Sequence, residues 1–224
     1  MSRYCRRFGG LVVGGIVCLT AQPLNRLTAQ HISVGPQIAF GDYKEVSVDL
    51  HYRGSGIAGK GTVSWKKFSA DVVLSKIAYQ REDGAATAEF DASEVDVRVR
   101  YSITGPVSAE LGFVNRKTDP EFEAQSVGAV VVGAQIAHLL GPGVRMTLNG
   151  GVLAGPKFSG GGSSSPLGAI QLGLGLTVDA LRGRLQLSGD YGFQRFSRET
   201  DDGSGPEPAP IQQSVGRVGL AIAF

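Results

Sequence analysis

The stretch EVDVRVRYS, residues 94–102, decides the fold of this 224-residue chain. Val95, Val97, Val99 and Tyr101 occupy every second position, and charged residues stand between them. Because side chains alternate between the two faces of a β-strand, the segment predicts a strand with one apolar and one ionised face. The fold then depends on what covers the apolar face.

The same alternation recurs along the chain after residue 30. We expect further strands over 32–42, 56–65, 68–80, 107–113, 127–140, 144–152, 169–180, 184–194 and 217–224. Together with 94–102 these make about ten strands, and the ambiguous segment 43–66 leaves eight as the alternative. No stretch shows a sustained helical stripe. A propeller would need about four strands in each forty-residue period, and this chain shows two.

Short and long connections alternate along the chain. Tight turns are expected at WKKF (65–68), ITGP (103–106), LGPG (140–143) and LRGR (181–184), and long polar loops at 80–93, 115–125, 155–168 and 197–212. This asymmetry, with strands of about ten residues, is typical of a transmembrane β-barrel. A sheet in hydrocarbon must close, because an open edge would leave its amide groups unpaired.

In a barrel the apolar face would meet lipid and the ionised face would point into the lumen. A Lys or Arg that faces lipid at the midplane costs about 2–4 kcal/mol, and the clear apolar faces carry no charge. Lys76 is the exception, and it requires a bulge or a position near the interface. The expected lumen charges are Asp96, Arg98, Arg100, Glu110, Arg145, Asp179, Asp190 and Arg217, with Asp71 and Lys60 beside them.

The nearly balanced signs of these charges predict ion pairs that plug the lumen. The alternative is a narrow pathway for water, ions or a small solute, because many inward glycines would leave space. Either arrangement gives little charge selectivity.

The N-terminus predicts an export signal. MSRYCRRF supplies three arginines, an apolar run follows from Gly9 to Leu19, and small-residue sites stand at Ala21 and Ala29. We expect a signal peptide over 1–30, cut after Ala29 or alternatively Ala21, and one barrel domain over 31–224. Removing that segment takes away both cysteines and changes the formal charge from +2 to −2. The basic pI therefore gives no argument for nucleic-acid binding.

The chain ends on RVGLAIAF, residues 217–224, with Val218, Leu220, Ile222 and Phe224 on one face. Together with the export signal and the loop asymmetry, this ending resembles the small, porin-like outer-membrane β-barrels of bacteria. The resemblance implies that these four residues form an assembly signal. It also implies that the barrel-assembly machinery and periplasmic chaperones are partners, and that the protein is integral to the bacterial outer membrane and contacts its lipid.

The expected fold is therefore all-β, a closed antiparallel up-and-down transmembrane β-barrel preceded by a signal peptide. The expected function is a structural or narrow-pore, small-solute transport role. The alternative is a surface-binding, adhesin-like barrel that engages an extracellular ligand through its long loops. The sequence does not separate these two classes.

An outer-membrane hydrolase is the remote alternative. Asp49 with His51, and Asp201 with Asp202, resemble the paired residues of outer-membrane proteases, but no wider motif surrounds them. His31-Ile32-Ser33 has the first spacing of the lipid-deacylating barrels and is followed by Val34 where that family has Asn. We expect no enzyme, no cofactor and no metal site, because no loop carries the oxygen-ligand or phosphate-loop pattern.

Overall fold

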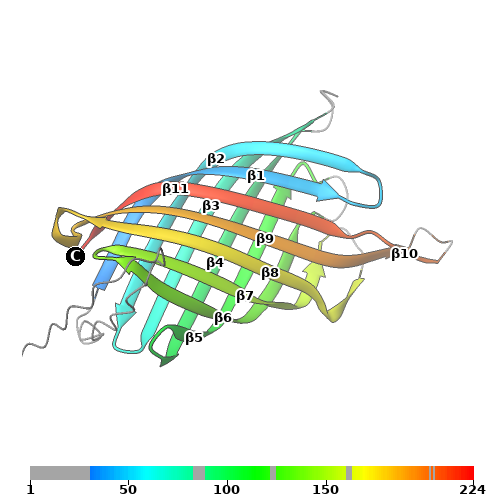
Figure 1. Ribbon diagram of the computed structural model, residues 1–224. Helices are drawn as coiled ribbons and strands as arrows, with labels where there is room; N and C mark the ends of the chain where they lie inside the picture. Colours follow the sequence, from blue (N-terminus) through cyan, green and yellow to red (C-terminus); the bar gives the residue numbers. More distant parts are fainter. Residues whose placement is uncertain (1–30, 83–88, 122–124, 160–162, 202, 204) are drawn as a thin grey trace, which may run out of the picture.

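The computed structural model describes residues 31–82, 89–121, 125–159, 163–201, 203 and 205–224. In this part of the chain ten long strands form one antiparallel sheet (Figure 1). They are β1 (His31–Glu45), β2 (Leu50–Trp65), β3 (Phe68–Arg81), β4 (Phe90–Thr104), β5 (Val107–Asp119), β6 (Val127–Gly141), β7 (Val144–Phe158), β8 (Ser163–Ala180), β9 (Leu185–Asp201) and β11 (Ile211–Ala223). The short strand β10 (Pro206–Pro208) pairs only with β9.

The sheet closes because β11 pairs with both β1 and β9, and β9 also pairs with β8. Every other pairing joins neighbours in the chain. The closed ten-stranded barrel is confirmed, and the eight-stranded alternative is wrong. Closure leaves no long open edge in the barrel wall, which is what hydrocarbon requires of a sheet.

The four expected tight turns lie at one end of the barrel, beside the C-terminus (Figure 1). We call this the turn end and the opposite one the loop end. The turn between β8 and β9 includes a single 3₁₀ turn, η1 (Leu181–Gly183). Among the described residues, no helix is long and apolar enough to cross a membrane.

The strands run further toward the loop end than the sequence predicts. They are 13–18 residues long, so much of the expected loops 115–125, 155–168 and 197–212 is strand. The β1–β2 connection is only residues 46–49, and most of the ambiguous segment 43–66 is therefore strand. The long-loop expectation was wrong at these positions because polar outward residues were interpreted as loop.

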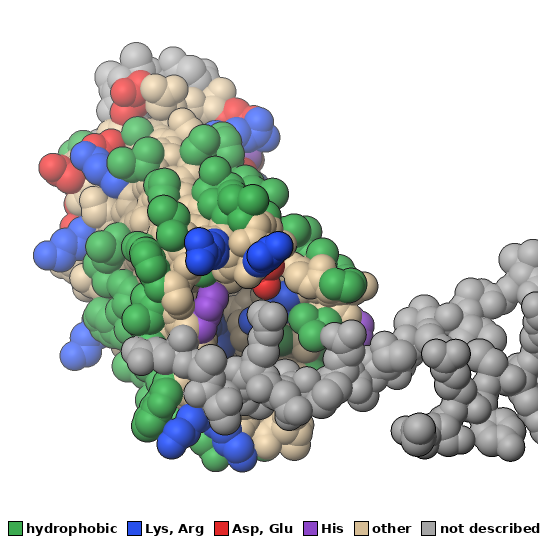
Figure 2. All heavy atoms as spheres, turned by 90° about the vertical axis from the view of Figure 1, so that its left-hand side faces the viewer, with side chains coloured by type: hydrophobic (Ala, Val, Ile, Leu, Met, Phe, Trp, Pro, Cys, Tyr) green, Lys and Arg blue, Asp and Glu red, His purple; other side chains and the backbone are tan. Residues whose placement is uncertain are grey.

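The outer wall nearer the turn end carries an apolar band. On β8 it contains Ile170, Leu172, Leu174 and Leu176, all of which are exposed. Figure 2, viewed from the turn end, shows hydrophobic side chains gathered along the wall. The band consists of the outward residues of 32–40, 57–65, 68–74, 95–103, 107–113, 130–140, 144–154, 170–178, 185–193 and 218–224.

Beyond the band the two faces of the strands exchange character. On β3, outward Leu74 is followed by outward Lys76, while inward Ser75 is followed by the buried Ile77 and Tyr79. We call this region the outer extension. It comprises residues 42–55, 76–81, 90–93, 115–119, 127–129, 155–158, 163–168, 195–201 and 211–216. Its wall is polar outside and apolar inside, as water on the outside demands.

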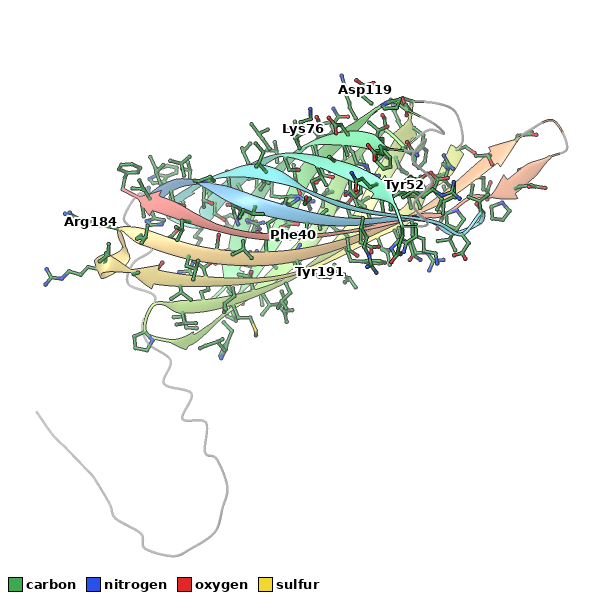
Figure 3. All side chains as sticks on the ribbon, turned by 90° about the horizontal axis from the view of Figure 1, so that it is seen from above. Phe40, Tyr52, Lys76, Asp119, Arg184 and Tyr191 are labelled. Atoms are coloured by element: carbon green, nitrogen blue, oxygen red, sulfur yellow. The ribbon has the colours of Figure 1, made fainter. Side chains whose placement is uncertain are left out.

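Lys76 lies at the edge of the band. The register of β3 with β2 and β4 is regular on both sides, so the bulge explanation is wrong. The Lys76 side chain is 63% exposed and its Nζ lies 2.8 Å from Asp91 Oδ2. Figure 3 places Lys76, Phe40 and Tyr191 near the middle of the barrel's length, with Tyr52 and Asp119 toward the loop end. Lys76 therefore stands at the outer interface rather than at the midplane.

The apolar band makes a direct prediction about lipid exposure. Leu174 is the central outward residue of β8 in the band, so Leu174→Arg should lower the free energy of unfolding by about 2–4 kcal/mol in vesicles. Ser197→Arg, on the outward face of the outer extension, should cost much less because that face meets water. Urea titration of the folded barrel, followed by the fluorescence of the single tryptophan, Trp65, measures both. Equal losses in the two variants would contradict the placement of the band.

Candidate functional site

An ionic network fills one side of the lumen inside the apolar band. Glu110 Oε1 lies 3.1 Å from Arg98 Nη1, and Glu110 Oε2 lies 2.7 Å from Arg100 Nε. Arg100 Nη1 also lies 2.5 Å from Asp71 Oδ2, and Arg98 contacts Asp96 with both Nε and Nη2. The Glu110 side chain is 0% exposed. The network joins β3, β4 and β5, and its charged groups are satisfied by each other.

A second group of charges continues the network toward β11 and β9. Arg217 Nη1 donates to Asp190 Oδ1 at 3.0 Å, and Arg217 Nη2 donates to Glu94 Oε1 at 3.4 Å. Gln37 Nε2 donates to Asp190 Oδ2 at 3.3 Å. Removing one partner of a buried pair leaves an uncompensated charge, which costs about 3–5 kcal/mol. The Arg217–Glu94 contact therefore joins β11 to β4 across the lumen, whereas Arg217 and Asp190 lie on the neighbouring strands β11 and β9.

Six of the eight predicted lumen charges lie in these two groups, namely Asp96, Arg98, Arg100, Glu110, Asp190 and Arg217. Arg145 and Asp179 are exposed near the turn end, and Asp179 Oδ1 accepts a hydrogen bond from Gln186 at 2.9 Å. Glu94 is not among the lumen charges predicted from the sequence. Glu94 lies two residues before Asp96 on the same strand, and this spacing indicates that both side chains point into the lumen.

A polar cavity of about 140 Å³ lies beside the network. Thr147, Asn149, Ser188 and Gln194 are among the side chains that line it. A volume of this size has room for several water molecules. Buried oxygens of Glu94, Gln194 and Gln213 have no hydrogen-bond partner among the described residues, and all three side chains border the cavity. The cavity is therefore polar and suited to water.

The inward glycines do not widen the lumen as the sequence analysis supposed. A Cβ on Gly35 would lie 1.8 Å from Leu220 O, and one on Gly219 would lie 2.3 Å from Pro36 O. At Gly173 the Asn149 side chain occupies the space, because a Cβ there would lie 2.3 Å from Asn149 Oδ1. These glycines allow close approach of neighbouring strands and side chains.

Above the polar lumen, in the outer extension, aromatic rings fill the barrel from several strands. Phe90 lies at the centre of one group, with ring centroids 4.9 Å from Tyr79, 5.2 Å from Tyr52 and 5.5 Å from Tyr43. On the other side Phe158 and Phe196 lie 6.1 Å apart. All of these except Phe158 are buried. Edge-to-face and stacked arrangements at these distances are the ones that aromatic pairs prefer.

Arg116 joins the two aromatic groups. Its guanidinium carbon lies 5.7 Å from the Tyr43 ring and 5.8 Å from the Phe196 ring, within the range of cation–π contacts. Its Nε donates to Gln125 O at 3.3 Å, and both terminal nitrogens lack a hydrogen-bond partner among the described residues. We call Tyr43, Tyr52, Tyr79, Phe90, Arg116, Phe158 and Phe196 the aromatic layer. The sequence did not predict this layer, because Phe90, Arg116 and Phe158 lie in the segments 80–93, 115–125 and 155–168 that were expected to be loops.

The residues considered for hydrolysis do not form a catalytic group in the described part of the chain. His51 lies on the outward face, with Nε2 2.7 Å from Asp42 Oδ2 and Nδ1 in contact with Glu82. Asp49 lies in the exposed turn 46–49, where the hydrogen bond and charge of Lys44 hold the pKa of its carboxyl below the ordinary value.

The remaining hydrolase candidates, Asp201 and His31, do not form a catalytic group in the described residues either. Asp201 Oδ1 accepts hydrogen bonds from the backbone of Gly203 and Gly205, and Asp202 lies outside the described residues. His31 lies at the turn end beside Gln186. No group of three or more His, Cys, Asp or Glu side chains within the described ranges could hold a metal ion.

The residues of the expected assembly signal lie on the lipid-facing wall. Val218, Leu220, Ile222 and Phe224 are 50–75% exposed, and the Phe224 backbone donates to Ile32 O at 2.8 Å. Ala21 and Ala29 lie outside the described residues.

No family model and no curated protein sequence matches the chain. Among solved structures, the chain is similar to Neisserial surface protein A, NspA, with 11% identity over 86% of this chain and 97% of that one, and a TM-score of 0.44. It is similar to the translocator domain of the autotransporter NalP from Neisseria meningitidis (14% identity; 86% and 88% covered; TM-score 0.41) and to the outer membrane protease OmpT from Escherichia coli (8%; 87% and 96%; 0.42). By its own coordinates, the chain is a closed, ten-stranded transmembrane β-barrel with the architecture of integral outer-membrane proteins.

Proposed function

We propose that this protein is a structural outer-membrane barrel whose lumen is closed on the cell-surface side, and that it passes no solute across the membrane. The observation that carries the proposal is the aromatic layer, which reaches across the barrel from β1–β4 through Arg116 to β7 and β9. Phe196 is 0% and Arg116 is 1% exposed. A layer from which water is excluded to this degree is a seal.

The width of the barrel favours the same interpretation. Eight strands enclose an interior just wide enough for side chains to fill, and ten strands widen it modestly. Here the ionic network fills one side of the lumen inside the apolar band, and a cavity of about 140 Å³ lies beside it. Inward residues near the turn end include the small Ser64, Ser69, Ser102 and Ser108 beside the polar Arg145, Asp179, Gln186 and His31. We infer a blind lumen that opens toward the turn end, which would face the periplasm.

A surface-binding role is the second candidate, and the outer extension favours it. The strands continue past the apolar band, and the β9–β10 hairpin projects furthest at the loop end (Figure 1). The outward face there is ionic: Arg53 Nη2 lies 3.1 Å from Glu82 Oε1. This polar rim offers contacts to a partner outside the cell. We propose no catalytic role for it.

One-sided access to the lumen tests the blind-end proposal. Thr147 lines the cavity, and the chain has no cysteine beyond Cys18, so Thr147→Cys gives a single lumenal thiol when the expected signal segment is removed. In oriented proteoliposomes, a membrane-impermeant maleimide should label it from the turn end only. Ser197→Cys, on the outward face, is the control and should react from the loop end. Labelling of the lumenal thiol from both ends would overturn the proposal.

The aromatic layer can be opened deliberately. The double variant Arg116→Ala/Phe196→Ala removes the two side chains that meet at the centre of the layer, so it should let the maleimide reach the thiol at position 147 from the loop end. Arg116→Leu keeps the volume without the unpaired guanidinium, and should stay sealed. In planar bilayers, wild type and Arg116→Leu should give no steady conductance. An ohmic channel in the folded wild-type protein would contradict a sealed lumen.

A further inference from the structure

A groove of about 580 Å³ crosses the outer wall of β2–β5 at the edge of the apolar band. Two lateral rows of outward side chains line it, as the strand register shows. The upper row is Ile57, Lys76, Ser93 and Lys117, and the lower row is Gly59, Leu74, Val95 and Asn115. Each row takes one residue from each of the four strands.

The groove exists because small residues stand between large ones. A Cβ built on Gly59 would meet no atom within 4 Å, so the wall is open at that point. Ser93 is the smallest side chain of the upper row, and exposed Ile57, Leu74 and Val95 form the apolar sides. An apolar furrow in a wall that faces hydrocarbon has the shape and chemistry to seat an acyl chain.

The polar end of the groove is cationic. Lys76 and Lys117 flank Ser93 from the two neighbouring strands, which places their Cα atoms about 10 Å apart. Lys76 forms an ion pair with Asp91, with 2.8 Å between Nζ and Oδ2. Lys117 is exposed and has no ion-pair partner among the described residues. One ammonium therefore remains free beside a serine hydroxyl, at the depth where Lys76 marks the interface (Figure 3).

We propose that this groove is a specific binding site for one anionic, phosphate-bearing lipid of the outer leaflet. Its acyl chain lies against Leu74, Val95 and Ile57. Its phosphate pairs with the Lys117 ammonium and accepts a hydrogen bond from the Ser93 hydroxyl, with Lys76 on the other side. The phosphate neutralises the charge of the Lys117 ammonium. The apolar furrow makes the site selective for a lipid over a free anion.

The position of the groove supports a lipid as the occupant. In its lower row Gly59, Leu74 and Val95 belong to the apolar band and must be covered by hydrocarbon, and in its upper row Lys76, Ser93 and Lys117 belong to the polar outer extension. A molecule that covers both rows must be apolar at one end and charged at the other. A membrane lipid meets both conditions.

The test uses the purified barrel with a mixture of dioleoyl phosphatidylglycerol and dioleoyl phosphatidylcholine at equal amounts, and counts bound lipid by native mass spectrometry. Wild type should retain phosphatidylglycerol at least fivefold over phosphatidylcholine. Lys117→Gln should remove that preference. Gly59→Phe should abolish retention of either lipid by filling the furrow, whereas Gly59→Ala should retain it. A shift in gel mobility on boiling confirms that each variant is folded.

Arg195→Gln is the matched charge control, because Arg195 is an exposed, outward cation just beyond the band on β9 and is not part of the groove. It should leave the preference intact. Equal loss in Arg195→Gln and Lys117→Gln would show diffuse charge attraction and overturn the site, as would unchanged retention in Gly59→Phe. Displacement of the lipid by millimolar inorganic phosphate would also overturn it, because the site would then recognise the anion alone.

Discussion

Each strand of this barrel passes from hydrocarbon into water, and the face that carries its apolar residues reverses at that crossing. In hydrocarbon every backbone amide must be paired within the sheet, so the wall closes and its apolar side chains point outward. Outside the bilayer the same wall meets water, and the hydrophobic effect favours apolar residues on the inside. On β5 outward Phe113 and inward Val114 stand on either side of this change. The arrangement of charges, aromatic rings and the lipid-facing groove follows from it.

The reversal divides the interior into two chemically different compartments. Inside the band the outward side is apolar, so polar groups collect in the lumen and satisfy each other as ion pairs. Inside the outer extension the lumen is a packed core of aromatic and apolar side chains, with Glu45, Arg116 and Arg198 buried among them. Amide side chains bond to groups within each compartment: Gln171 Nε2 donates to Glu110 Oε1 at 3.2 Å inside the band, and Gln213 Nε2 donates to Tyr79 Oη at 3.3 Å inside the outer extension. The aromatic layer at the outer end is thus a consequence of extending the strands into water.

The sequence alone predicts the barrel, its ten strands and their tight turns, because alternation with a period of two is local and the band repeats it in every strand. It does not predict where the strands end at the loop side. There the alternation continues with its phase reversed, as in Ile77 and Tyr79 against Lys76, and a polar outward face is easily interpreted as loop. Lumen partners such as Arg98 and Glu110 have an inward phase that can be inferred from sequence. The pairing of Arg217 with Glu94 depends on closure, which brings together residues 123 apart.

Arg116 shows why the aromatic layer cannot be predicted from the sequence and what stabilises it. A guanidinium inside a core is unfavourable unless it is paired, and two of its nitrogens have no hydrogen-bond partner among the described residues. The faces of Tyr43 and Phe196 compensate part of this cost, and such cation–π contacts strengthen when water is excluded. The two rings come from β1 and β9, which are far apart in the chain. No local sequence pattern therefore predicts their contacts with Arg116. The long Arg116 side chain spans the space between the rings on β1–β4 and the rings on β7 and β9. It thereby joins the two aromatic groups into one layer at the outer end of the barrel.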